Sequence, residues 1–101
     1  MIIYNVTTKV DQSIAEKWIK WVREEYNPAM LASGCFTNAV ILRLIDLDDM
    51  DHPTFAIQYH APSEEVYRQF LVDLSEKMST TALNKWGNKI ISFKSALEVI
   101  E

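Results

Sequence analysis

WIKWVREEYNPAMLASGCFTNAVILRLID, residues 18–46, is the stretch around which the rest of the chain is organised. Apolar residues recur at helical spacing from Ile14 up to Pro28, which predicts that the first half is the back of a helix. Residues 35–46 are extended, with side chains alternating between two faces. Gly34 supplies the left-handed residue that a helix end often requires. The stretch therefore predicts a helix, a reversal and a long strand.

Similar patterns predict the elements on either side. Residues 2–10 alternate and are rich in β-branched side chains, which indicates a strand before the first helix. After the central stretch, residues 54–60 alternate again and residues 63–86 repeat apolar side chains at helical spacing, with a soft spot expected at 79–81. Residues 90–100 alternate as a last strand. The expected order is strand, helix, strand, strand, helix, strand.

That order is the split βαβ, or ferredoxin-like, arrangement of an α+β protein. Right-handed crossovers put both helices on one face of a four-stranded antiparallel sheet. The length of 101 residues fits a single domain over 1–101. We expect these side chains to lie under the helices: Tyr4, Val6, Leu42, Leu44, Phe55, Ile57, Tyr59 and Phe93.

The opposite face of this predicted sheet has no helices to cover it. It would carry apolar side chains between polar ones: Ile3, Ala39, Ile41, Ala56 and Ala96. A half-apolar face of this kind favours a protein partner, and two-fold dimers are the commonest closed assembly. We therefore expect a homodimer in which two sheet faces meet as a dimeric α/β barrel.

Composition excludes several classes of protein. Hydrophobic residues make up 49% and charged residues 24%, which is typical of a globular chain. The net charge of −4 argues against nucleic acid, whose phosphates require a surplus of Lys and Arg. The N-terminal residues form neither a signal peptide nor a membrane span. A single cysteine fits a reducing compartment, so we expect a cytoplasmic protein with no membrane partner.

Six polar side chains are predicted to project from the face without helices: Asn5, Arg43, Gln58, His60, Ser92 and Lys94. Because the first and third strands are neighbours in this topology, Asn5 should lie near Gln58 or His60. One interpretation is a ligand-binding pocket formed by Asn5, Arg43, Gln58 and His60. His60 would be its acid or base, and the planar fork of Arg43 would bind a small anionic molecule.

The other interpretation of these residues, which we favour, is a hydrogen-bonded dimer interface in which Arg43 pairs with Glu98. We expect no metal site and no cofactor. The acidic run 46–52 lacks the glycine and distal glutamate of a calcium loop, so a solvated hairpin tip is the simpler reading. Cys35 has no histidine placed beside it and is expected to be structural. The three tryptophans are expected in the core.

The chain resembles a family of short bacterial proteins, DUF4286, over nearly its whole length. The likeness lies in MIIYNVT (1–7), WIKW (18–21), Pro28, GCFT (34–37), LRL (42–44), QY (58–59) and LEVI (97–100). More distantly the chain is similar to the dimeric α/β-barrel superfamily, which includes antibiotic-biosynthesis and haem-degrading monooxygenases. Family members often have a histidine two residues before the proline, where this chain has Tyr26.

The resemblance implies a fold and leaves the activity open. Related haem-degrading enzymes use an asparagine of the first strand, a tryptophan and a histidine; Asn5 and His60 match two of these, but no tryptophan lies on a predicted strand. Two function classes follow. We favour a non-catalytic homodimeric module that binds a small molecule or a partner. The alternative is a cofactor-independent, monooxygenase-like enzyme acting in the barrel interior, for which the catalytic residues are unassigned.

Overall fold

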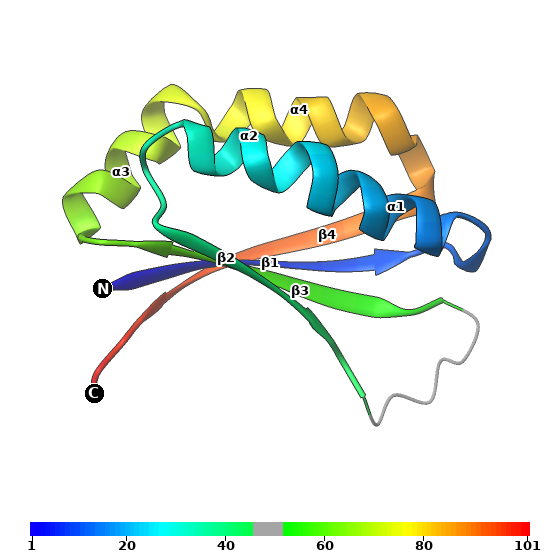
Figure 1. The fold of residues 1–101 in the computed structure, drawn as a ribbon, viewed down its shortest axis with the longest axis horizontal. Coiled ribbons are helices and arrows are strands. Elements are labelled where there is room, and N and C mark those ends of the chain that lie inside the picture. Colours follow the sequence, from blue (N-terminus) through cyan, green and yellow to red (C-terminus); the bar gives the residue numbers. More distant parts are fainter. Residues whose placement is uncertain (46–51) are drawn as a thin grey trace.

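The computed structural model describes residues 1–45 and 52–101, and Figure 1 shows their arrangement as one sheet with a layer of helices on one side. In chain order the elements are β1 (Ile2–Val10), a short 3-10 turn (Gln12–Ile14), α1 (Ala15–Trp21), a π turn (Val22–Tyr26), α2 (Asn27–Ala32), β2 (Asn38–Arg43), β3 (Thr54–Ala61), α3 (Glu64–Asp73), α4 (Ser75–Trp86), a second 3-10 turn (Gly87–Lys89) and β4 (Ile90–Glu98).

The strands lie in the order β2-β3-β1-β4 and every neighbouring pair is antiparallel. The helices cover one face of this sheet (Figure 1). This arrangement confirms the predicted ferredoxin-like α+β fold and the adjacency of the first and third strands. β1 has the predicted bounds, whereas β2 is shorter than predicted at both ends.

The first helical stretch runs without a break from α1 through the π turn into α2. Pro28 has no N–H and its ring would crowd the carbonyl four residues earlier. The wider π turn precedes it, and the Asn27 N–H bonds to the Val22 carbonyl five residues back. The second helical stretch breaks at Leu74, where φ is −131°. The predicted soft spot at 79–81 is therefore wrong, because those residues lie inside α4.

The core between sheet and helices is largely aromatic. Tyr4 of β1 packs against Phe36, Tyr59 and Phe70, with ring centroids 5.3 to 6.1 Å apart. Trp18 of α1 lies on Phe55 of β3 at 5.4 Å. Burial of such rings is the main source of stability in a core this small. The expectation that the tryptophans are core residues is confirmed, with Trp86 partly buried against the cluster.

The faces of β2 are opposite to those predicted. Ala39 and Ile41 lie directly across from Tyr59 and Ile57 of β3, so they share the helix-covered face. Leu42 and Leu44 consequently project away from the helices, and both are exposed. The alternation of β2 is apolar on both faces, so the pattern fixed the period without fixing the orientation.

The faces of β4 are also reversed. Its register with β1 runs unbroken from Ile90 to Glu98, so no bulge near Ser95 changes the alternation. Phe93 lies across from Thr7, on the face without helices, and is 70% exposed. Lys94 lies across from Val6, on the helix-covered face.

Candidate functional site

The sheet face without helices is the candidate site, and we call it the open face. Register places its side chains in four rows that cross β2, β3, β1 and β4 in turn. The rows are Asn38, His60, Ile3, Leu97; then Val40, Gln58, Asn5, Ser95; then Leu42, Ala56, Thr7, Phe93; then Leu44, Thr54, Lys9, Ile91. Large apolar side chains therefore dominate the outer strands, and polar side chains gather toward the middle.

The polar centre, hereafter the polar band, consists of Asn5, Thr7, Gln58 and Ser95. Asn5 stands across from Gln58 on one side and Ser95 on the other. Its Nδ2 donates to Thr7 Oγ1 at 3.0 Å and to Ser95 Oγ at 3.4 Å. Both N–H groups of this amide thereby find acceptors within the band.

His60 lies at one end of the polar band. It stands between Ile3 of β1 and Asn38 of β2 in the neighbouring row. The predicted grouping of Asn5, Gln58 and His60 on one face is confirmed, and Asn5 is directly paired with Gln58. Their role as ligand-binding residues stays a prediction.

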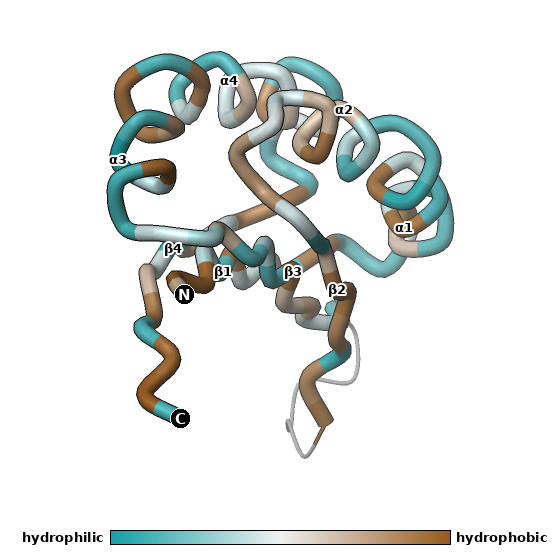
Figure 2. Tube along the Cα trace, turned by 60° about the vertical axis from the view of Figure 1, so that its left-hand side comes forward, coloured by the Kyte–Doolittle hydropathy of each residue, from teal (hydrophilic) through white to brown (hydrophobic). Residues whose placement is uncertain are grey.

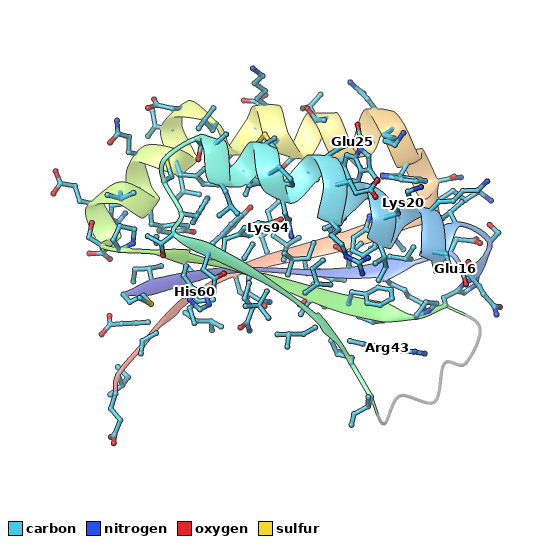
Figure 3. All side chains as sticks on the ribbon, in the orientation of Figure 1. Glu16, Lys20, Glu25, Arg43, His60 and Lys94 are labelled. Atoms are coloured by element: carbon cyan, nitrogen blue, oxygen red, sulfur yellow. The ribbon has the colours of Figure 1, made fainter. Side chains whose placement is uncertain are left out.

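Arg43 does not belong to this group. It lies across from Phe55, whose side chain is buried under α1, so Arg43 projects toward the helix side. It lines an open depression with residues of α1. Five residues separate it along β2 from the position across from His60, which is about 17 Å at the usual strand rise. Figure 3 shows the two side chains far apart on the sheet.

Three further polar residues are on the helix side: Ser92, Lys94 and Glu98. The predicted pairing of Arg43 with Glu98 across the open face is therefore wrong, because neither side chain is on that face. The physical reason is the same reversal of β2 and β4 described above. Without Arg43, the open face also loses the guanidinium on which the prediction of an anionic ligand rested.

Two apolar margins flank the polar band, and sequence reasoning missed them. The margin on β2 consists of Val40, Leu42 and Leu44, and the margin on β4 consists of Ile91, Phe93 and Leu97. In Figure 2 the largely brown end of β2 and the C-terminal segment, in which brown and teal alternate, descend on the same side of the sheet, away from the helices. The open face is thus bordered by two apolar walls. The alternation of β4 already separates Ile91, Phe93 and Leu97 from the polar residues of that strand. What the sequence did not show was which face of the sheet these apolar residues occupy.

The remaining sequence candidates are placed as follows. Cys35 is half-buried in the segment between α2 and β2, where its Sγ lies 4.0 Å from the Ser33 carbonyl oxygen. Residues 46–51 of the acidic run are outside the part of the chain that the structure describes. Within residues 1–45 and 52–101, no three acidic, His or Cys side chains gather as a metal site. No helix in these described ranges has the length and apolarity to cross a bilayer.

The fold and its open face define the class of protein, which is the ferredoxin-like α+β class. Two solved structures similar to this chain are described as dimeric ferredoxin-like proteins from an uncultured marine organism. One has a TM-score of 0.75 at 10% identity and covers 99% of this chain and 95% of its own. The other has a TM-score of 0.70 at 11% identity and covers 100% and 96%.

A third similar structure is an ethyl tert-butyl ether d (EthD) family protein from Bacillus halodurans. Its TM-score is 0.64 at 9% identity, and the match covers 98% of this chain and 100% of that one. No curated protein matches. The chain belongs to the DUF4286 family, described as a domain of unknown function, which matches residues 1–100. The resemblance predicted from the sequence is thereby confirmed.

Proposed function

We propose that the protein is a homodimeric, non-catalytic binding module in which the open faces of two copies meet. The observation that supports this most directly is the pair of exposed apolar margins on one sheet face. Phe93 is 70% exposed and Leu42 is 40% exposed. Several large apolar side chains on one face exceed what a monomer usually leaves in water.

The occupant of this face is best explained as a second copy. The margins lie on both outer strands with the polar band between them, so the face can be matched to itself by a two-fold axis. Apolar margins would then meet apolar margins, and the two polar bands would face one another across the interior. Two structurally similar proteins are described as dimeric, which supports a dimer for this chain as well.

The interior of such a dimer suits an uncharged polar ligand. Asn5, Thr7, Gln58 and Ser95 contribute amides and hydroxyls, and no member of the band carries a charge. His60 would add a donor or acceptor at one end. Polar groups that remain within an apolar rim are usually satisfied by water or by a ligand. Asn5, Gln58 and His60 are therefore the residues we assign to binding.

Assembly is tested by placing a charge in one margin. Phe93→Glu should convert the dimer to a monomer in light scattering at micromolar concentration, because burying an unpaired carboxylate opposes association. Val72→Glu is the matched control: Val72 is 84% exposed on α3, on the helix side, and its variant should remain a dimer. A wild-type protein of 11.7 kDa mass in solution would refute the proposal.

Binding is tested separately from assembly. The double variant Asn5→Leu, Gln58→Leu should remain a dimer, because both residues are in the band and not in the margins. Uncharged amides and alcohols should give ligand-observed NMR transfer signals with the wild type and lose them with the double variant. Equal signals from both proteins would remove the polar band as the binding site and leave the dimer in place.

A further inference from the structure

A second cavity lies on the other side of the sheet, within each subunit. Its volume is about 220 Å³, and it is bounded by β1, β3 and β4 below and by α1, the π turn and α4 above. That volume corresponds to about seven water molecules at about 30 Å³ each. It is separate from the open face and does not depend on the proposed dimer.

Most of the cavity wall is apolar, and its largest side chains are aromatic. Trp18 is 2% exposed, Trp21 is 8% exposed, and Tyr4 and Tyr59 complete the floor toward the sheet. The π turn contributes Tyr26, whose Oη donates to the Met78 carbonyl at 3.1 Å and so points away to α4. Aromatic and aliphatic side chains of this kind suit the apolar ring of a ligand.

One end of the cavity is polar and carries a positive charge. Thr8 Oγ1 and Ser92 Oγ are hydrogen-bonded at 2.9 Å, and Lys94 reaches from β4 to bond Ser79 Oγ on α4. Lys94 is exposed, so it lies at the mouth, and Figure 3 shows it between sheet and helices. Among residues 1–45 and 52–101, its Nζ has no carboxylate within ion-pair distance.

An interior with aromatic side chains and a lysine at the mouth together favour a ligand that has an apolar ring and a negative charge. We propose that this cavity binds a small aromatic carboxylate, with its ring against the apolar wall that includes Trp18 and Trp21 and its carboxylate on Lys94 and the Ser92 hydroxyl. An ammonium with free donors forms charge-assisted hydrogen bonds with a carboxylate. A neutral ring without the carboxylate would leave that end of the cavity unmatched.

The test uses benzoate as the probe and benzamide as its uncharged analogue. Benzoate should shift the indole N–H signals of Trp18 and Trp21 in ¹H–¹⁵N correlation spectra and saturate. Benzamide should bind about tenfold more weakly, which corresponds to the loss of one charge-assisted hydrogen bond. If benzoate leaves the indole N–H signals of both Trp18 and Trp21 unchanged, the proposed site is refuted.

Two variants locate the site. Lys94→Met should weaken benzoate to the level of benzamide, whereas Lys20→Met, at an exposed lysine of α1 that does not line the cavity, should leave benzoate binding unchanged. Ala82→Leu places a larger side chain in the cavity wall and should abolish binding while preserving the fold. Undiminished benzoate binding in either cavity variant would overturn the proposal.

Benzoate binding in this cavity can be tested separately from dimerisation through the open face. The Phe93→Glu variant should bind benzoate as the wild type does, because Phe93 is on the opposite face of the sheet. Loss of benzoate binding in that variant would place the site at the dimer interface and contradict this inference.

Discussion

Tyr26 and Asn27 show how single residues connect the helical layer to the sheet. The Asn27 Oδ1 accepts a hydrogen bond of 2.6 Å from the Tyr59 hydroxyl in the core. The family resemblance noted from the sequence implies a histidine at the position of Tyr26. Burial raises the pKa of Tyr26 to about 12, and burial also raises the pKa of Tyr59 and Tyr4. At neutral pH these three hydroxyls stay protonated, so Tyr26 cannot replace a histidine as a proton carrier.

These raised pKa values predict a loss of stability in alkali. The folded pKa of Tyr26 is about 12 against an ordinary value of 10.0, so its contribution is complete below about pH 10 and is lost as pH rises through about 12. The urea midpoint should therefore fall over that window. In Tyr26→Phe the fall should be smaller, because one ionisable phenol is removed. An equal fall in both proteins would show that Tyr26 is not linked to unfolding.

The residues at the helix ends are the ones from which the structure of this chain is most directly predicted. Ser63 has extended backbone angles, and its Oγ accepts from the Val66 N–H at 3.2 Å at the start of α3. Glu64 and Glu65 follow in the first turn, where negative charge is favourable. At the other end of this layer, Gly87 has φ +56°, a conformation that other residues adopt only at a cost. The start of α3 and the end of α4 follow from such local chemistry.

The cap at Ser63 can be measured directly. Ser63→Ala should lower the free energy of unfolding by about 1 kcal/mol, because one N–H at the start of α3 loses its acceptor. Ser63→Asp retains an acceptor and should stay near the wild-type value. Both are measured by urea unfolding followed by circular dichroism. A Ser63→Asp variant as unstable as Ser63→Ala would show that the cap is not the cause.

On the scale of the whole molecule, the two faces of the sheet differ in the side chains that they present. The helix side holds the aromatic core and the cavity behind Lys94. The open face has the apolar margins and the polar band. A short chain buries a smaller fraction of its surface than a long one, so the proposed dimer interface would add stability to the single core. The proposed interface would account for the orientation of β4, whose most apolar residues point away from the helices.

If folding and dimerisation are linked, stability must depend on protein concentration. A tenfold rise in concentration should stabilise the folded dimer by about 1.4 kcal/mol of dimer and raise its melting temperature. The melting temperature of Phe93→Glu should be independent of concentration. Calorimetry over about a hundredfold range of protein concentration, which is two tenfold steps, measures whether the melting temperature depends on concentration. A wild-type melting temperature that does not change would contradict an obligate dimer.

The sequence by itself determined the order of elements, the ferredoxin-like topology and the pairing of Asn5 with the third strand. Each of these depends on local periodicity, on caps and turns such as Ser63 and Gly34, and on the handedness of crossovers. The sequence also predicted that one face would be uncovered. The faces of β1 and β3 were predictable because their buried aromatics, Tyr4 and Tyr59, have no apolar competitor of similar size on the other parity.

Only the tertiary structure decided which way β2 and β4 face. Both are outer strands, so one neighbour and a partly covering helix determine their orientation, and hydrophobicity alone pointed the wrong way for Leu42 and Phe93. A shift of one residue in register exchanges the two faces of a strand. Because both strands face the opposite way from the prediction, Arg43 and Lys94 lie on the helix side. The same orientation places the apolar margins on the open face and Lys94 at the mouth of the cavity.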